Sequence, residues 1–448
     1  MNMPSLSDTG TTKSTENVRR QRIIRVGILA EEPLGWGSGK HVFYIILDKY
    51  TWNMGDTTYT FTVDFVYDSD IIKGQLNTSR YDVLLVPGGG VGDGLAVMKG
   101  FTFLPRVRKW KNNIAAFIKG GGGYVGICGG TALITNLKTA SLKPRTFMER
   151  QYDKSSLGVS CVSSYYPHLA FPLFYFFQKK HPENIGPISY VFSFAPGITT
   201  DGIRPYAAGA PLDFQIYKDN PIFSDIPGGT QRIRWWGGPS LIVPDKPDRE
   251  VKVLATYPKK DVSEDDALRI HAWRYKGGLH GLILGFLKAF RLIKQDHESL
   301  RHLLLYTFYL AGKWERTDKT IVLDHGNRPS ITAETFPNEH KGRILLCTAH
   351  PEYLTWWNGH IKERKDSEYP CLGTGLYQWE DIAPLSKTGV QELTYTWWMV
   401  RRFVAWAAKV PDAHLPPRHK EELSEKEHGL LVKDIFWDGT LSGQMNNI

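Results

Sequence analysis

A cysteine and a histidine in this chain have neighbours that suit covalent catalysis. Cys128 lies within Gly-Ile-Cys-Gly-Gly after a short apolar stretch, and His350 follows 222 positions later (350 minus 128) within Ala-His-Pro-Glu. A cysteine flanked by glycines between a strand and a helix is typical of a nucleophile elbow, where a tight turn lifts the side chain out of the sheet. The amino end of the following helix stabilises the thiolate, which attacks carbonyl carbon. Cys128 is therefore a candidate nucleophile for acyl chemistry.

His350 is the expected general base for that nucleophile, and Glu352 is the expected carboxylate that orients its imidazole. Both residues follow an apolar stretch over residues 342–348. Alternate residues of a strand share one face of a sheet, but residues beyond the strand need not. The sequence alone therefore leaves the position of the Glu352 side chain open.

The segments that must hold these residues alternate between strand and helix patterns. Residues 22–30 and 81–86 are short apolar runs typical of buried strands, while residues 104–119 carry apolar side chains at helical spacing and are followed by four glycines. A later apolar stripe predicts a helix that starts near Thr388, with a capping box, and stops before Pro411. Such alternation is typical of α/β proteins.

The chain is expected to form one α/β domain between two polar tails. Residues 1–20 are polar and rich in Ser and Thr, which predicts a disordered tail, and residues 416–448 predict a charged C-terminal tail. The domain itself is expected to span residues 21–415. Insertions, the first of them rich in aromatic residues and proline, are expected around residues 142–215, 258–340 and 354–386.

Composition and charge narrow the possible partners. Of the 448 residues, 42% are hydrophobic and 23% are charged, which suits a globular chain that buries a core. No apolar run reaches membrane-spanning length, because glycines, Lys288 and Arg291 interrupt residues 279–293. The net charge of +9 is scattered along the chain without a long basic run. We therefore expect neither a nucleic-acid partner nor a membrane partner.

Cysteine usage and the first residues predict the compartment. The four cysteines are far apart and form no CxxC pair, and the first twenty residues lack the apolar core of a signal peptide. We expect a cytoplasmic protein without disulfides. Because no HExxH or other ligand spacing occurs, no metal is expected, and no cofactor is expected either.

Several motifs together resemble the class I glutamine amidotransferase-like superfamily, and most closely the N-terminal, amidotransferase-like domain of biotin-protein ligases. The motifs are Val-Leu-Leu-Val-Pro-Gly-Gly-Gly (residues 83–90), Tyr-Val-Gly-Ile-Cys-Gly-Gly (124–130), Trp-Gly-Gly-Pro (236–239), Gly-Arg-Ile-Leu-Leu (342–346) and His-Pro-Glu (350–352). The resemblance implies a flavodoxin-like, mostly parallel sheet flanked by helices, with the active site at the carboxyl ends of the strands.

Carried over to this sequence, the resemblance implies Cys128 as nucleophile, His350 as base and Glu352 as orienting carboxylate. It also implies an oxyanion hole made by the backbone N–H of Gly129 and one from Gly89 or Gly90. The loop of Trp236, Gly237 and Gly238 is a candidate substrate pocket, although packing explains Trp236 equally well.

Two functions of different classes remain open. The first is a cysteine-dependent amidase, hydrolase or amidotransferase-like enzyme with a Cys-His-Glu triad, a thioester intermediate and a small-molecule amide or acyl substrate. The second is a non-catalytic amidotransferase-like module that binds a small metabolite or a protein partner. The second draws support from Thr131-Ala132, because glutaminases of this superfamily usually have Gly-His-Gln after the nucleophile.

Overall fold

The structure is a computed structural model that describes a little over half of the chain. The described residues are 19–30, 40–88, 99–138, 147–165, 175–178, 197–199, 202–204, 210–235, 238–258, 269–275, 277–292, 314–322, 325–337, 342–353, 355–357, 360–364, 376–380, 392–394 and 396–419. Most of the two expected tails, residues 1–18 and 420–448, therefore lies outside the described residues.

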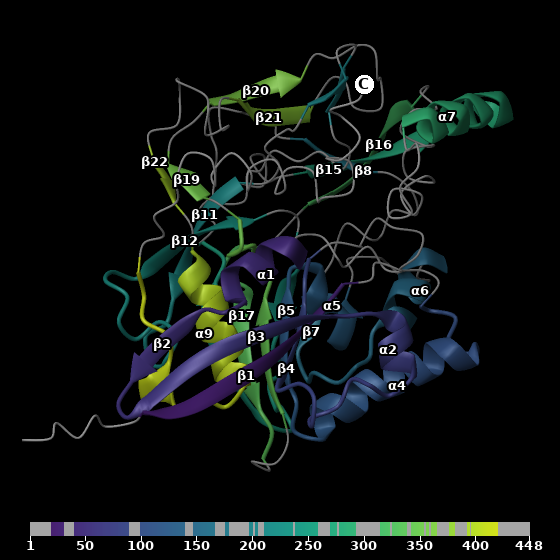
Figure 1. The fold of residues 1–448 in the computed structure, drawn as a ribbon. Coiled ribbons are helices and arrows are strands. Elements are labelled where there is room, and N and C mark those ends of the chain that lie inside the picture. The colour runs from purple at the N-terminus through teal and green to yellow at the C-terminus, as the bar shows by residue number, and fades with distance from the viewer. Residues whose placement is uncertain are drawn as a thin grey trace, which may run out of the picture.

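A ten-stranded sheet forms the centre of the molecule, in the order β12-β11-β14-β17-β18-β5-β4-β1-β3-β2 (Figure 1). Its strands are β1 (Arg20–Leu29), β2 (Thr51–Met54), β3 (Thr57–Val66), β4 (Val83–Val86), β5 (Gly123–Ile127), β11 (Ala210–Ile216), β12 (Thr230–Trp235), β14 (Glu250–Thr256), β17 (Pro329–Thr335) and β18 (Arg343–Cys347). The five central strands, β18 to β3, run parallel. The structure is thus of the α/β class.

The sheet is mixed, so the expectation of a mostly parallel sheet holds only for its centre. Strand β17 pairs antiparallel with both β18 and β14, and β11 pairs antiparallel with β14 and β12. Two of these strands, β11 and β17, overlap or lie within ranges expected to be insertions. Their pairing partners are distant in sequence, which is why local patterns did not place them in the main sheet.

The central strands form because their apolar side chains are buried on both faces. All four residues of β4 and all five of β5 are buried, as expected for near-continuous apolar runs in a parallel sheet. Side chains alternate along β4, so that Val83 and Leu85 join one hydrophobic core while Leu84 and Val86 join the other. Two cores therefore sandwich the sheet.

Helices cover both faces of the sheet (Figure 1). The helices that the structure describes are α1 (Lys40–Leu47), α2 (Asp68–Ile72), α4 (Pro105–Lys119), α5 (Gly129–Ile134), α6 (Phe147–Ser155), α7 (Gly278–Leu292), which lies apart from the sheet, and α9 (Trp397–Ala407), with a 3-10 turn at Asp412–His414. Helices α1 and α9 contribute to the first core, and α2, α4 and α5 to the second. The predicted helix over residues 104–119 corresponds to α4.

Helix α9 begins later than predicted. Residues Glu392–Thr394 form strand β22, which pairs with β19 (Thr355–Trp357), and the helix starts at Trp397. The strand pairing explains the late start, because it holds these residues extended. Every residue of α9 is buried, so its predicted stripe is part of a helix surrounded by protein.

Smaller sheets are built from the segments between the main strands. They contain β6 (Asn136–Lys138), β7 (Ser163–Tyr165) and β13 (Ser240–Ile242); β8 (Tyr175–Gln178), β15 (Arg269–Tyr275) and β16 (Trp314–Val322); β9 (Gly197–Thr199) and β10 (Gly202–Arg204); and β20 (His360–Arg364) and β21 (Leu376–Glu380). Among the helices that the structure describes, none is both long and apolar enough to cross a membrane.

Candidate active site

Cys128 occupies a tight turn between β5 and α5. Its backbone has φ 48° and ψ −111°, a conformation that costs a non-glycine residue about 1–3 kcal/mol. Hydrogen bonds hold the turn: the Cys128 N–H donates to Cys347 O (2.7 Å), and the Thr131 N–H and hydroxyl donate to Cys128 O (3.0 and 2.6 Å). The predicted elbow is therefore present as backbone geometry, with Cys128 at the amino end of α5.

Glycines around this turn let the backbones approach closely. A Cβ atom on Gly130 would lie 2.2 Å from Val86 O, and one on Gly126 would lie 2.6 Å from Gly130 O. Real Cβ atoms do not come that close to backbone oxygens, so glycine is required at 130, where β4 packs against the elbow, and at 126, where β5 passes the start of α5.

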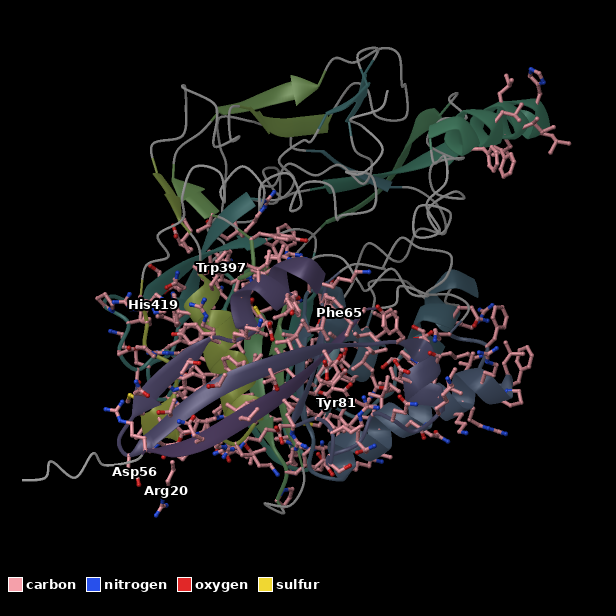
Figure 2. The ribbon with its side chains drawn as sticks, viewed as in Figure 1. Arg20, Asp56, Phe65, Tyr81, Trp397 and His419 are labelled. Carbon is pink, nitrogen blue, oxygen red and sulfur yellow. The ribbon has the colours of Figure 1, made fainter. Side chains whose placement is uncertain are left out.

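Pairing of β5 with β18 brings the distant half of the site to Cys128. The two strands run parallel with Ile127 opposite Cys347, so the residues after each strand meet at the same edge of the sheet. In Figure 2, Trp397 of α9 lies toward this edge, at the opposite end of the sheet from Arg20 and Asp56. The loops that carry Cys128 and His350 thus leave the sheet side by side.

His350 and Glu352 form a buried hydrogen-bonded pair. Nδ1 of His350 lies 2.7 Å from Oε1 of Glu352, and both side chains are buried. The His350 N–H donates to Arg234 O (2.8 Å), and the His350 ring stacks on Tyr353 with centroids 5.0 Å apart. The open question about Glu352 is thereby answered, since its side chain faces the imidazole.

Helix α9 fixes the loop that carries Glu352. The Trp397 indole N–H donates to Glu352 O (2.9 Å), and the Thr396 hydroxyl donates to Pro351 O (3.0 Å). Among the described residues, Oε2 of Glu352 has no hydrogen-bond partner. The carboxylate is therefore held by its backbone and by His350.

The electrostatics of the site favour a charged imidazole. Burial lowers the pKa of His350, but the charges of Cys128 and Glu352 and hydrogen bonds to both side chains outweigh it and raise the pKa from 6.5 to about 10. At neutral pH the imidazole is then protonated.

Gly88, in the loop after β4, lies against both catalytic candidates. A Cβ atom there would lie 2.7 Å from Cε1 of His350 and 2.8 Å from Cβ of Cys128. Gly89 and Gly90, the expected oxyanion donors, lie outside the described residues, whereas Gly129 opens α5 and is buried. The described part of the loop therefore reaches the site at Gly88.

Gly238 is the part of the expected substrate pocket that the structure describes, since Trp236 and Gly237 lie outside the described residues. A Cβ atom on Gly238 would lie 1.9 Å from Thr348 O and 3.5 Å from Sγ of Cys128. The Trp235 indole N–H donates to Gly238 O (3.1 Å). Gly238 is thus a wall of the site beside the sulfur.

Sequence reasoning missed Gly88, Arg234 and Tyr353. Arg234 is buried, and its guanidinium carbon lies 5.6 Å from the centroid of the Tyr353 ring. The sequence carried no signal for Arg234, because an arginine between Ile233 and Trp235 fits the alternation of polar and apolar residues in a strand that reads Thr-Gln-Arg-Ile-Arg-Trp. The aromatic residue directly after His-Pro-Glu carried no signal of its own, because its contact depends on a turn.

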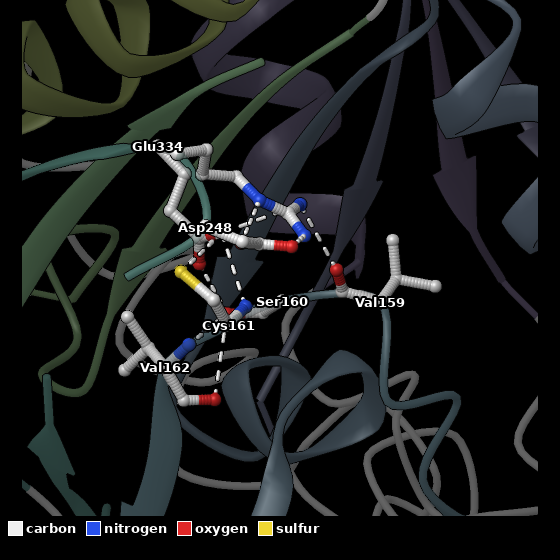
Figure 3. Close-up of polar contacts among 7 residues, drawn as sticks. Val159, Ser160, Cys161, Val162, Asp248 and Glu334 are labelled. Atoms are coloured by element: carbon white, nitrogen blue, oxygen red, sulfur yellow. Dashed lines mark hydrogen bonds and ion pairs between the residues drawn. The ribbon is translucent and has the colours of Figure 1, made fainter. Parts of the chain in front are cut away.

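The other described cysteines have surroundings that disfavour reaction. Figure 3 shows Cys161 beside the buried carboxylate of Glu334, with Sγ of Cys161 3.4 Å from Oε2. Burial, together with the charge of Glu334, raises the pKa of Cys161 to about 12. Burial also raises the pKa of Cys347. Both thiols stay protonated at neutral pH.

The carboxylate of Glu334, shown in Figure 3, has several polar partners. The Ser160 hydroxyl and the Cys161 N–H donate to its carboxylate, and Arg249 lies 3.7 Å away. Burial raises the pKa of Glu334 despite these donors. We interpret this cluster as a polar link between β17 and the segment before β7.

Neither the protein-family models nor the curated proteins contain a match to the chain. Within the part of the chain that the structure describes, no three His, Cys, Asp or Glu side chains are grouped to hold a metal ion.

Proposed function

We propose that the chain is a cysteine-dependent amidase, hydrolase or amidotransferase-like enzyme that works through a thioester on Cys128. The observation that carries the proposal is the buried His350–Glu352 pair, 2.7 Å apart, beside a cysteine held at φ 48°. Strained backbone at a nucleophile and a base oriented by a third group are the recurring features of such sites.

The reaction proceeds in two steps. The Cys128 thiolate attacks the carbonyl carbon of an amide, and a C–S bond forms as the C–N bond breaks. The His350 imidazolium gives its proton to the leaving amine and then, as a neutral base, takes one from the water that hydrolyses the thioester. Glu352 accepts the hydrogen bond from Nδ1 of His350. Nε2 is then the nitrogen that exchanges protons with the sulfur and the leaving group.

The oxyanion of each tetrahedral intermediate needs backbone donors. We assign the N–H of Gly129, at the start of α5, and one N–H from Gly89 or Gly90 to this role. Loss of one such donor costs about 3 kcal/mol of barrier in well-studied hydrolases. The close approach of Gly88 to Cys128 supports the assignment, because it brings the loop after β4 to the nucleophile.

A flavodoxin-like fold of the class I glutamine amidotransferase-like type is part of the proposal, with the N-terminal domain of biotin-protein ligases as its nearest likeness. The parallel strands lie in the order β3-β1-β4-β5-β18, which in chain order is 2-1-3-4-5. That order is the flavodoxin-like one, in which sites lie beyond the carboxyl ends of the strands. A cytoplasmic location fits the free thiols of Cys128, Cys161 and Cys347.

A non-catalytic binding module is the second candidate, and Thr131 favours it. Its side chain is buried and donates to Cys128 O, whereas glutaminases of the superfamily have histidine at this position. In this second function the site would bind a small metabolite or a protein partner without forming a thioester. The substrate proposed for the enzymatic candidate is a small-molecule amide or acyl compound.

Acyl transfer to the sulfur tests the proposal. Incubation with p-nitrophenyl acetate should add one acetyl group to Cys128, seen by intact and peptide mass spectrometry, and the adduct should then hydrolyse. Cys128→Ala should lower turnover at least about 1,000-fold, and His350→Ala should slow it strongly. Cys161→Ala is the matched control and should behave as wild type. Absence of the Cys128 adduct would favour the binding module.

A further inference from the structure

Helix α7 stands apart from the main sheet. It spans Gly278–Leu292, follows β15, and extends outward at the upper right of Figure 1. Its 15 residues give a length of about 22 Å, less than the thickness of a bilayer core. The helix is therefore too short to cross a bilayer, and any contact with a partner would involve its side.

One side of α7 is both apolar and exposed. Leu279, Ile283, Phe286, Leu287 and Phe290 are each between 45% and 74% exposed. At 3.6 residues per turn these five positions fall within an arc of about 100°, so they form one continuous stripe, which we call the α7 apolar face.

The buried residues of α7 lie on the other side of the helix. Gly281 and Gly285 are buried, and both lie away from the α7 apolar face around the helix. The exposed apolar side chains therefore lie on the side of α7 away from these two glycines.

The sequence of the helix and its flanks carries acidic or basic charge of one sign only. Residues 274–294 contain no Asp or Glu but include five basic residues, namely Arg274, Lys276, Lys288, Arg291 and Lys294. Two such helices from two copies would repel each other, whereas an anionic surface is complementary.

We propose that α7 docks on an anionic lipid surface, with the α7 apolar face inserted at the boundary between headgroups and acyl chains. A short helix with large apolar side chains on one side and only basic charges is the pattern of interfacial helices. Each basic residue near an anionic leaflet adds to the attraction. The proposal departs from the expectation of no membrane partner, which rested on spanning length and does not bear on a helix that lies flat. It is independent of the function proposed for Cys128.

Vesicle flotation of the full chain tests the proposal. We expect binding to vesicles of phosphatidylcholine with about one third phosphatidylserine, weaker binding to phosphatidylcholine alone, and release at high salt because salt screens the charges. Equal binding to both vesicle types would overturn the claim that α7 prefers an anionic surface. No binding to either would overturn the proposal.

Paired variants locate the binding surface. Phe286→Glu with Phe290→Glu should lower vesicle partitioning by about tenfold or more for each side chain, because a buried phenylalanine contributes at least that factor. The control is Phe103→Glu, since Phe103 is 73% exposed and lies just before α4, and it should bind as wild type.

A charge variant and a measurement of oligomeric state distinguish a lipid surface from a second copy of the chain or an acidic protein. Lys288→Gln with Arg291→Gln should reduce the preference for anionic vesicles. Sedimentation velocity without lipid should show the same mass for wild type and for the Phe286 and Phe290 variant. A dimer that this variant abolishes, with no lipid binding, would identify a second copy as the occupant and overturn the proposal. Pull-down of an acidic protein through the α7 apolar face, again without lipid binding, would also overturn it.

Discussion

Cys128 adopts a backbone conformation that costs free energy, and its neighbours hold it there. The hydrogen bond to Cys347 O and those from Thr131 fix the peptide groups on both sides of the cysteine. The Cys128 side chain interacts with His350, whose ring is fixed by Glu352 and by the face of Tyr353. Cys128 and His350 are thus each held in place by contacts with neighbouring residues.

The raised pKa of His350 makes stability depend on pH. Its unfolded value is 6.5 and its folded value is about 10, so the stabilisation is fully present below pH 6.5 and is lost as pH rises through about 10. Urea unfolding of wild type at several pH values should therefore show a free energy of unfolding that falls between pH 6.5 and 10.

His350→Gln is the control for that pH dependence. The variant lacks the titrating group, so its free energy of unfolding should change less over the same range. An equal slope in wild type and in His350→Gln would mean that His350 is not protonated in the folded protein at neutral pH, which contradicts the electrostatic account.

At the scale of elements, the loop between β12 and β13 needs glycine where it passes the site. Gly238→Ala places a methyl group 1.9 Å from Thr348 O, and because that atom is backbone, the strands must shift. We expect a loss of about 3 kcal/mol in the free energy of unfolding, at the upper end for overpacked sites. Gly229→Ala in the loop before β12 is the control, since a Cβ there meets nothing within 4 Å. Thermal or urea unfolding measures both; similar stability of the two variants would contradict the packing described for Gly238.

Local patterns predicted the elements closest to the nucleophile better than those farther away. Strand β4, helix α4 and the Cys128 elbow followed from apolar runs, helical spacing and glycines, all of which act within about fifteen residues. The start of α9 and the place of β17 in the sheet depend on strand pairing across long stretches of chain. Gly88 and Tyr353 escaped notice for the same reason, since their contacts exist only after β4, β5 and β18 have paired.

At the scale of the whole molecule, the sheet joins two halves of a site that are far apart in sequence. Parallel pairing of β5 with β18 sets the register in which Cys128 and His350 meet, and α9 closes the site through Trp397 and Thr396. Helix α7 lies well away from this edge (Figure 1). Substitutions in α7 should therefore change lipid binding without changing the chemistry at Cys128, and substitutions at Cys128 should do the reverse.

The most direct test of the central claim is the rate of Cys128 alkylation by iodoacetamide as a function of pH, in wild type and in His350→Ala. Peptide mass spectrometry follows Cys128 and Cys161 in the same sample, and Cys161 serves as the slow internal reference because its pKa is raised to about 12. The account predicts that Cys128 is alkylated much faster than Cys161 near neutral pH, and that much of this rate is lost in His350→Ala. A Cys128 that reacts no faster than Cys161, or equally fast without His350, would contradict the catalytic assignment.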